Sequence, residues 1–313
     1  MERGAARIGI LASGDGWHLR ALAAALVRLG CEPVLLDAKG LSGLVAERAA
    51  ISTSGHELER LDALLVRLIP PGSLDQIVFR IDCLHLLADR GLLVVNSPRA
   101  LERTVDKHWT SRLLQEAEVP TPRTVAAEGF DDAMQAFASM RDVLVKPLLG
   151  SGGRGIVRIS DEDLAYRTFR TLEMQRAVFY LQEFVPHGRS DLRLFVAGGR
   201  LLAAARRTGR GWKTNVAAGA EATPHRARPD EEDLALRACR AVGADYAGVD
   251  LVEAEDGRLL VLEVNGIPGW SALQKTTCTD IAFEIARLVT ARLPARHDAA
   301  ARPKSPLGAT PSH

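Results

Sequence analysis

The sequence predicts an N-terminal parallel α/β domain of Rossmann-like type, followed by a two-part α+β region. Its 313 residues correspond to two domains at roughly 150 residues each. In residues 1–97, short apolar runs alternate with helical segments of about 10–15 residues, which favours a parallel sheet covered by helices. Beyond residue 97 the apolar runs follow one another in hairpins, which is typical of antiparallel sheets.

The composition excludes several classes of protein. Apolar residues make up 47% and charged residues 25%, as in ordinary globular proteins. Lys and Arg number 40 and Asp and Glu 39, so the net charge of +1 gives no general attraction for nucleic acid or an anionic membrane. No signal peptide and no membrane-spanning apolar run is found, and the four cysteines form no C-x-x-C pair. We therefore expect a cytoplasmic protein without a zinc cluster or a disulfide framework.

The N-terminal elements follow from the apolar pattern. Strands are expected at 7–12, 33–36, 63–66 and 92–95, and helices at 17–29 and 75–89. Residues 13–16 are Ser-Gly-Asp-Gly, a turn between the first strand and the first helix. This turn lacks the third glycine of a dinucleotide-binding fingerprint, so we favour a plain connection over a cofactor site.

The second half begins with Ser97, which suits a helix N-cap, and Pro98, which suits the first helical position. Helices are expected at 106–116, 161–175, 230–242 and 279–293, and strands at 142–146, 156–159, 180–185, 192–197 and 201–207. Gly198 and Gly199 predict a two-residue hairpin turn. The expected units are residues 98–185 and 186–293, and the Ala/Pro/Ser-rich residues 294–313 are expected to be a disordered tail.

A second hairpin, at residues 246–266, brings carboxylates together. If Asp256 and Gly257 form its two-residue turn, Asp250 lies directly opposite Glu263, and Asn265 shares their face. Two carboxylates and an amide oxygen are donors that Mg²⁺ prefers, whereas opposed carboxylates without a cation repel each other. The other strand face is expected to join the core through Val249, Leu251, Leu260, Leu262 and Val264. We favour a metal site over a solvated face or a glycosidase pair.

A glycine-rich loop predicts contact with phosphate. Lys146 precedes Gly150-Ser151-Gly152-Gly153-Arg154-Gly155, where small residues allow backbone N–H groups to approach phosphate oxygens. A Walker A loop would end in Gly-Lys-Ser/Thr and open a helix, whereas a strand is expected to follow here. The loop is therefore predicted to be a flap between two antiparallel strands.

Two further segments carry polar groups of interest. The strand at 180–185 contains Glu183, whose side chain and backbone could bind a purine edge, although a plain strand is equally compatible. Arg206, Arg207, Arg210 and Lys213 form a basic run before Asn215. Adjacent strand residues point to opposite faces, so one of Arg206 and Arg207 can enter a site while the other is solvated. An exposed charged edge is the alternative.

In this order, the motifs resemble the ATP-grasp superfamily and, within it, the RimK-type amino-acid ligases. The resemblance runs from about Asn96 to Leu293 and rests on NSPRALERTVDKHWTSRLLQEAEVPTPRT, VKPLLGSGGRGI, QEFV, SDLRLFVAGGRLLAAARR, KTNVAAG, AGVDLVE, LEVNGIPG and LQKTTCTDIA. It implies a pre-ATP-grasp domain followed by the small and large parts of an ATP-grasp unit. It also implies that ATP and Mg²⁺ are used, with Mn²⁺ as an alternative.

The resemblance implies a role for each matching position. Lys107 and Lys146 would contact the ATP phosphates, under a flap containing Gly150, Ser151, Gly152, Gly153 and Gly155. Adenine would contact Glu183, Phe184 and Val185, and the ribose Asp191. Lys213 and Asn215 would lie near the nucleotide, and Asp250, Glu263 and Asn265 would hold Mg²⁺. Arg206, favoured over Arg207, would stabilise the oxyanion formed when an amine attacks the acyl group.

The implied reaction is amide formation through an acyl phosphate, with ADP and phosphate as products. The preferred substrates are L-glutamate and a small pterin-like carboxylate acceptor, bound between the first domain and the nucleotide. Arg67, at the end of a predicted strand, is a candidate for a substrate carboxylate, with Arg207 as a second. A protein C-terminus as acceptor, a kinase, and a regulatory module without ligase activity are the alternatives, and a homo-oligomer is left open.

Overall fold

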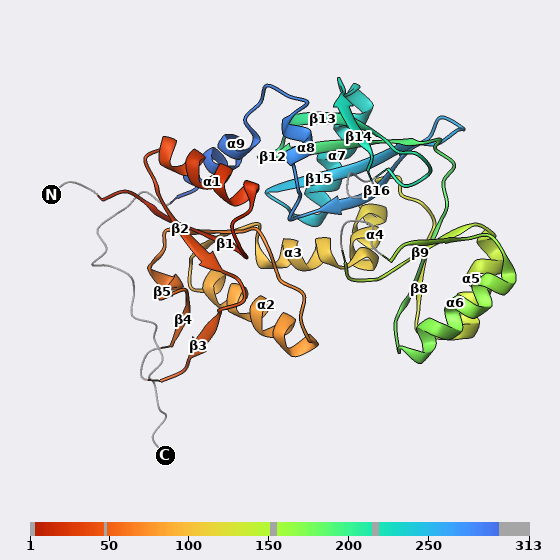
Figure 1. Ribbon diagram of the computed structural model, residues 1–313, viewed down its shortest axis with the longest axis horizontal. Coiled ribbons are helices and arrows are strands. Elements are labelled where there is room, and N and C mark those ends of the chain that lie inside the picture. The colour runs from red at the N-terminus through yellow and green to blue at the C-terminus, as the bar shows by residue number, and fades with distance from the viewer. Residues whose placement is uncertain (1–3, 47–48, 151–154, 215–218, 294–313) are drawn as a thin grey trace, which may run out of the picture.

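The computed structural model describes residues 4–46, 49–150, 155–214 and 219–293. A parallel α/β unit lies at one end, a small sheet with two helices lies at the other, and a larger sheet lies between them (Figure 1). This mixed α/β architecture agrees with the expected fold class. No described helix is long and apolar enough to cross a membrane.

The N-terminal sheet is parallel, with the strand order β2-β1-β6-β7. Its strands are β1 (Arg7–Ala12), β2 (Glu32–Asp37), β6 (Ala63–Val66) and β7 (Leu93–Val95), and its helices are α1 (Trp17–Arg28) and α2 (Leu74–Asp89). The chain leaves β1 on one side to form β2 and returns to the other side to form β6. The carboxyl ends of β1 and β6 therefore lie at the point where the strand order reverses.

A small antiparallel sheet in this unit was not expected. It consists of β3 (Ser42–Leu44), β4 (Ala50–Thr53) and β5 (His56–Glu57), and the 3₁₀ turn η1 (Leu58–Arg60) follows. These strands are too short to show an alternating apolar pattern. The sequence therefore carried no signal by which to find them.

Two capped helices connect the N-terminal unit with the rest of the chain. The Ser97 side chain accepts a hydrogen bond from Ala100 N and caps α3 (Pro98–Val105), as expected. The Asp106 side chain accepts one from Trp109 N and caps α4 (Lys107–Glu116), so this helix begins one residue later than expected. The cap places Lys107 at the first position of α4.

The small sheet at the far end is antiparallel, in the order β10-β9-β11-β8. It contains β8 (Thr124–Ala127), β9 (Val143–Lys146), β10 (Val157–Ile159) and β11 (Phe179–Glu183). The helices α5 (Phe130–Met140) and α6 (Glu162–Met174) pack beside each other against it (Figure 1). Strand β8 and helix α5 were missed in the sequence.

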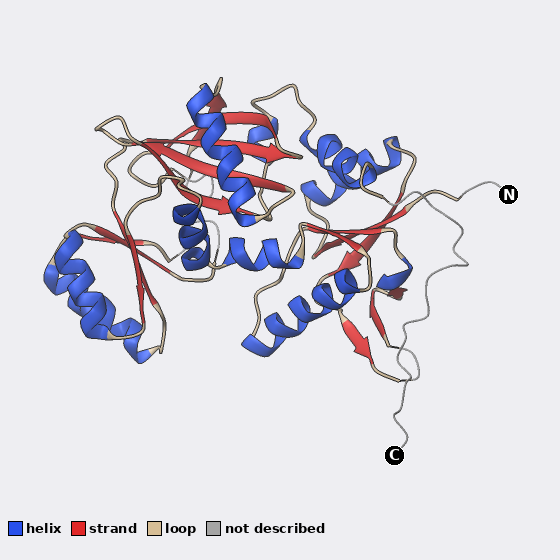
Figure 2. Cartoon of the chain, turned by 180° about the vertical axis from the view of Figure 1, so that it is seen from behind, coloured by secondary structure: helices blue, strands red, loops and turns tan. Residues whose placement is uncertain are grey.

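The larger sheet has the order β14-β13-β12-β15-β16. Its strands are β12 (Ser190–Ala197), β13 (Arg200–Thr208), β14 (Glu221–Pro224), β15 (Tyr246–Glu253) and β16 (Leu259–Asn265). Helix α7 (Pro229–Val242) covers one face (Figure 2), and α8 (Ser271–Gln274) and α9 (Ile281–Thr290) follow the last strand. Gly198 and Gly199 have positive φ angles of 57° and 71°, which forms the expected tight turn between β12 and β13.

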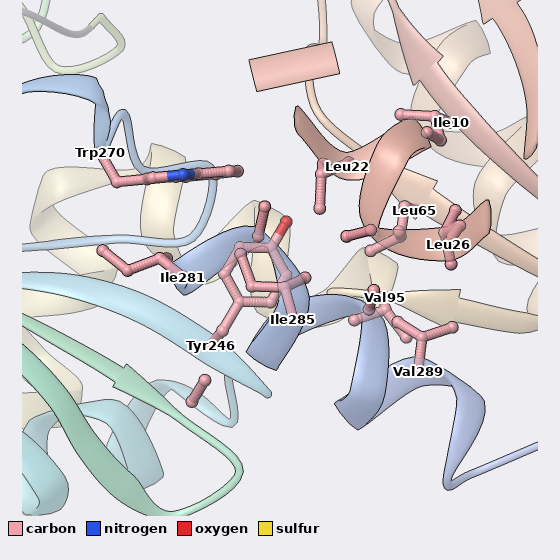
Figure 3. Close-up of a cluster of buried hydrophobic side chains, with 14 of the residues drawn as sticks. Ile10, Leu22, Leu26, Leu65, Val95, Tyr246, Trp270, Ile281, Ile285 and Val289 are labelled. Atoms are coloured by element: carbon pink, nitrogen blue, oxygen red, sulfur yellow. The ribbon is translucent and has the colours of Figure 1, made fainter. Parts of the chain in front are cut away.

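One hydrophobic core joins the N-terminal unit to the larger sheet. Ile10 and Leu22 from the first unit pack in the same cluster as Tyr246, Trp270 and Ile285 (Figure 3). All five side chains are at most 1% exposed. The two units therefore bury apolar surface against each other, which fixes their relative position.

Asn96, which follows β7, adds a polar connection inside this core. Its Oδ1 accepts hydrogen bonds from Asp245 N at 2.7 Å and Tyr246 N at 3.1 Å. Its Nδ2 donates to Tyr246 O at 2.8 Å and Gly266 O at 2.6 Å. The side chain is fully buried, so three of these four bonds satisfy backbone groups that water cannot reach.

Replacing Asn96 with alanine should lower the free energy of unfolding by about 3 kcal/mol, because four hydrogen bonds are lost and the backbone partners in three of them stay buried. Denaturant unfolding measures this. Ser97→Ala is the matched control, which removes only a helix cap and should cost about 1 kcal/mol. An Asn96→Ala variant as stable as Ser97→Ala would contradict the connecting role.

Candidate active site

The hairpin of β15 and β16 brings Asp250 opposite Glu263, as predicted, but the turn and the strand register differ from those predicted. The turn has three residues rather than two: Ala254 N donates to Arg258 O at 2.8 Å, and Gly257 adopts a φ of 85°. The register then shifts between Asp250 and Leu251, where β16 contains one extra residue. The two deviations cancel at Asp250, so the expected pairing there is confirmed although the predicted two-residue turn is wrong.

The same irregularity changes which face Leu262 occupies. Leu262 was expected in the core with Val249 and Leu251. Instead Val261 occupies the core beside them, and Leu262 lines the cavity described below. Leu260 packs in a separate small cluster that includes Val252.

Asp250 lies between two arginines. Its Oδ1 accepts a hydrogen bond from Arg193 Nη1 at 2.6 Å, and its Oδ2 lies 3.0 Å from Arg207 Nη2. Arg207 also forms a two-pronged pair with Asp191, with Nε–Oδ1 at 2.7 Å and Nη2–Oδ2 at 2.5 Å. Thr214 donates to the same carboxylate at 2.6 Å. All five residues are buried, so solvent screens these interactions little.

The two opposed carboxylates of the hairpin differ in their affinity for protons. Burial by itself favours the neutral form of Asp250, but the guanidinium groups of Arg193 and Arg207 outweigh it and hold its pKa below the usual range. Burial raises the pKa of Glu263, and the neighbouring Asp250 carboxylate raises it further, against the opposing effect of Lys146 and Lys107. Of the two carboxylates, Glu263 is therefore the one whose positively charged neighbours do not offset the effects of burial and of Asp250 on its pKa.

Asn265 faces both Glu263 and Arg193. With its amide nitrogen toward Glu263, it donates to Oε1 at 3.1 Å and accepts from Arg193 Nη1 at 3.0 Å. In the opposite orientation its oxygen faces Glu263 Oε1, and two acceptors so close require a cation or a shared proton between them. The site can thus present Asp250, Glu263 and the Asn265 oxygen to a hard cation.

The donor set fits Mg²⁺. This ion takes one or two protein carboxylates and completes its shell with water and phosphate oxygens. In the described part of the chain, no group of three or more His, Cys, Asp or Glu side chains has metal-binding geometry. A closed all-protein site of the kind that zinc prefers is therefore not found among these residues.

Two lysines face this hairpin from the small sheet and its connecting helix. Lys107 Nζ donates to Leu148 O at 3.2 Å and to Gly150 O at 2.9 Å, and Lys146 Nζ donates to Gln182 Oε1 at 2.5 Å. Burial lowers the pKa of Lys107, and it lowers the pKa of Lys146 to about 8, although Glu263 acts in the opposite direction on both. Among the described residues neither ammonium group has a direct carboxylate partner, and two such desolvated groups are suited to binding an anion.

Lys146 and the hairpin share a cavity of about 430 Å³. Its lining includes Leu144, Ile156, His187 and Trp212, and also the consecutive segment Ile267, Pro268, Gly269, Ser271, Ala272 and Leu273. The charged residues Asp191, Arg193, Arg207, Asp250 and Glu263 lie along its wall. A chamber of about 30 Å³ lined by Lys107 and Tyr180 adjoins it through Lys146 and Glu263, which line both.

The structure brings Arg207, rather than the favoured Arg206, into this cavity. A two-residue turn at Gly198–Gly199 with regular pairing would place Arg206 opposite Asp191. However, the register shifts by one residue between Phe195 and Val196, which pairs Asp191 with Arg207. Arg206 is half-buried instead, and its Nη1 donates to Ser190 Oγ at 3.3 Å.

The remaining expected site residues lie in varied places. Lys213 lines the cavity, and its Nζ donates to Ile156 O at 3.1 Å. The Glu183 side chain is exposed, whereas Phe184 and Val185 are buried and Phe184 packs edge-on against Trp212. Gly150 lines the smaller chamber. Ser151, Gly152, Gly153 and Asn215 lie outside the described residues, as does the predicted tail.

Arg67 does not line the cavity. Its Nη2 donates to Pro268 O at 2.8 Å, its Nη1 donates to Tyr246 Oη at 3.3 Å, and its guanidinium lies 4.5 Å from the centre of the Trp270 ring. It therefore contacts the back of the segment that forms the cavity wall.

Sequence reasoning missed Arg193, His187, Trp212 and Gly248. Arg193 was detectable in principle, because it is two residues beyond Asp191 and strand alternation places both on one face. Gly248 is required by a contact that no local pattern reveals. A Cβ atom there would lie 2.3 Å from Cζ and Nη2 of Arg193.

The chain matches the RimK-like ATP-grasp domain over residues 104–289. The tetrahydromethanopterin:α-L-glutamate ligase of Methanosarcina acetivorans is 30% identical over 297 residues, covering 84% of this chain and 92% of that protein. The ligase of the same name from Methanocaldococcus jannaschii is 36% identical over 235 residues, covering 73% of this chain and 79% of that protein. The chain therefore belongs to the RimK-like ATP-grasp family.

A solved structure agrees with the fold. The ATP-grasp ligase PsnB, complexed with a minimal precursor, aligns with a TM-score of 0.73 at 21% identity, over 91% of this chain and 99% of that one. PsnB has also been solved with a minimal precursor, Mg and ADP. The expected ATP-grasp fold is thereby confirmed.

The depressed pKa of Lys146 predicts a pH dependence of ATP binding. A lysine with a pKa of about 8 loses its charge as the pH rises through that value, so the dissociation constant of ATP should increase above it, by up to about tenfold per pH unit. Calorimetric titration from about pH 7 to about pH 9 measures this. Lys146→Arg keeps its charge over this range and should show a flatter profile. Equal slopes for the two proteins would contradict the prediction.

Gly248→Ala should impair the site through Arg193, because the new methyl group would displace the guanidinium that holds Asp250. The rate of Mg²⁺-dependent ADP release should fall by about 100-fold, as for other displacements of about 1 Å at reacting centres. Gly16→Ala is the control, since a Cβ there meets no atom within 4 Å. Full activity of a folded Gly248→Ala variant would show that Arg193 has room to move.

Proposed function

We propose that the chain is an ATP-dependent ligase that activates a carboxylate as an acyl phosphate and joins it to the amine of L-glutamate, with a pterin-like molecule as acceptor. Membership of the RimK-like ATP-grasp family supports the class, an acid–amino-acid ligase. The observation that carries the proposal is the meeting of two half-buried lysines, two carboxylates with an amide, and two arginines around one cavity and the chamber that adjoins it.

The ATP phosphates are assigned to the region between the lysines and the hairpin. Lys107 and Lys146 supply positive charge from one side, where their Nζ atoms now donate to neutral oxygens. The base is assigned to the part of the cavity lined by Leu144, Ile156 and Leu262, because Leu262 packs against the cluster that contains Val185. Asp191 is already paired with Arg207 and Thr214, so a ribose hydroxyl would have to share its oxygens with them.

Asp250, Glu263 and Asn265 would hold Mg²⁺, with Mn²⁺ as an alternative of similar ligand preference. The bound cation would offset negative charge on the phosphate oxygens. Glu263 fits this role because burial and Asp250 raise its pKa, and a positive charge nearby would favour its ionised form.

Arg207 takes the place proposed for Arg206. The acyl phosphate carries a phosphate leaving group, and attack by the glutamate amine places negative charge on the former carbonyl oxygen. A guanidinium in a buried site stabilises such an oxyanion without first having to reorient. Arg207 is held in place by Asp191 and Asp250, so its own position is fixed before the substrate enters.

The acceptor is assigned to the part of the cavity lined by residues from 267 to 273. This part is formed by Ile267, Pro268, Ala272 and Leu273 with the Ser271 hydroxyl nearby, and therefore suits a molecule with an apolar or flat body. The proposal of a pterin-like acceptor and of glutamate is supported by the names of the two archaeal relatives. Arg67 is not assigned to a substrate carboxylate, because backbone and aromatic contacts already occupy it.

Incubation with ATP, Mg²⁺, L-glutamate and tetrahydromethanopterin tests the function. We expect ADP release that requires both co-substrates, and a product heavier than the acceptor by one glutamyl residue on mass spectrometry. Omitting glutamate separates a ligase from a kinase, which would phosphorylate the acceptor without an amine. If L-aspartate supported as much ADP release as L-glutamate, the proposal of glutamate as the amino-acid substrate would be contradicted. If no acceptor gave an amide product, the proposal that the chain is a ligase would be contradicted.

A further inference from the structure

Residues 266–271, here called the acceptor loop, follow β16 directly and form one wall of the cavity. Burial alternates along this loop: Gly266, Pro268 and Trp270 are buried, whereas Ile267, Gly269 and Ser271 are at least partly accessible. The accessible residues all line the cavity, as does Pro268, whereas Gly266 and Trp270 do not. The loop thus presents its accessible residues to the cavity and the backbone of its buried residues to the N-terminal unit.

Each of the three buried residues forms one hydrogen bond between its backbone and a side chain of the N-terminal unit. Asn96 Nδ2 donates to Gly266 O at 2.6 Å, and Arg67 Nη2 donates to Pro268 O at 2.8 Å. Trp270 N donates to His18 Nε2 at 2.9 Å. The three contacts are spaced two residues apart, in step with the alternation of burial.

The topology of the parallel sheet explains why these side chains can reach the loop. Arg67 directly follows β6, and His18 lies in the first turn of α1, just beyond β1. The carboxyl ends of β1 and β6 meet where the strand order reverses, and a crevice at such a point is a usual place for a ligand in α/β proteins. In this chain the crevice holds the acceptor loop, with Trp270 packed on His18 at 4.5 Å between ring centres.

Arg67 and His18 are chemically suited to holding a backbone. In the described part of the chain, Arg67 forms no ion pair with a carboxylate, and its guanidinium is used by Pro268 O, Tyr246 Oη and the Trp270 ring. Burial, together with the nearby Arg67 charge, lowers the pKa of His18 to about 4. The imidazole is therefore neutral near pH 7, and its Nε2 is available as an acceptor.

We propose that the N-terminal unit sets the shape of the acceptor loop, with His18, Arg67 and Asn96 as positioning residues for the acceptor. This inference rests on the proposed function only in naming the acceptor as the substrate affected. None of the three side chains lines the cavity, so they act through the loop backbone rather than by touching a substrate. The N-terminal unit thereby determines acceptor affinity without affecting the part of the cavity assigned to the nucleotide.

His18 is the position to test, because it is only half-buried, whereas Asn96 is fully buried and its loss should destabilise the fold. His18→Ala removes the acceptor for Trp270 N. In His18→Gln the side-chain oxygen is as many bonds from Cα as Nε2 is in histidine, so the bond can form again. Arg20→Ala on the same helix is the matched control, since Arg20 is exposed and pairs only with Asp15 among the described residues.

The first readout is hydrogen–deuterium exchange of the peptide covering residues 266–273, without any substrate. Exchange in His18→Ala should be about tenfold faster than in the unmodified protein, which corresponds to about 1.4 kcal/mol for one hydrogen bond. His18→Gln should return exchange toward the original rate, and Arg20→Ala should leave it unchanged. Unchanged exchange in His18→Ala would overturn the proposal.

The second readout is steady-state kinetics with tetrahydromethanopterin as acceptor. His18→Ala should raise the acceptor KM by about tenfold, for the same loss of one hydrogen bond, and leave the KM for ATP unaltered. Equal rises of both KM values would overturn the proposal, because they would indicate general damage. If the unmodified protein makes no product with this acceptor, the proposed function fails, whereas the exchange experiment still decides whether His18 holds the loop.

Discussion

The pairing of Asp250 with two arginines is the interaction on which the rest of the site depends. Arg193 and Arg207 contact opposite oxygens of this carboxylate, and Arg207 is in turn held by Asp191. The pair of arginines keeps Asp250 ionised although it is buried, and this charge raises the pKa of Glu263 across the hairpin. The site therefore holds a carboxylate that needs a further positive charge to stay ionised. It lies next to two lysines whose pKa values are lowered by burial.

The N-terminal unit completes this arrangement on the same face of the larger sheet, because Phe195, Ala205 and Tyr246 of that face belong to the core that it shares. A shared apolar core fixes the two units relative to each other, and Asn96 satisfies backbone groups of Tyr246 and Gly266 at the ends of the two strands that carry Asp250 and Glu263. The proposed Mg²⁺ ligands and the acceptor loop are consecutive in sequence, since Asn265 directly precedes Gly266. The buried Asn96 thus holds the start of the acceptor loop, one residue beyond Asn265.

Sequence reasoning reached the fold class, the family and the Asp250–Glu263 pair, because these depend on alternation and on motifs that are continuous in the chain. It failed where one extra residue in a strand changes the register. The irregularity in β16 moved Leu262 from the core to the cavity, and that between β12 and β13 exchanged Arg206 for Arg207. Such irregularities are stabilised by packing between segments that are distant in the sequence, and this packing cannot be recognised from a local residue pattern. The contacts of His18, Arg67 and Gly248 are also long-range and leave no local signal.

We propose that Glu263 is the carboxylate of the hairpin that requires a cation once a nucleotide is bound. Calorimetric titration of Mg²⁺ into the ADP-loaded protein, compared with its Glu263→Gln variant, measures this requirement. We expect saturable Mg²⁺ binding to the unmodified protein and a loss of affinity of at least about tenfold in the variant, because one carboxylate ligand is removed. Equal Mg²⁺ affinity of the two proteins would contradict it.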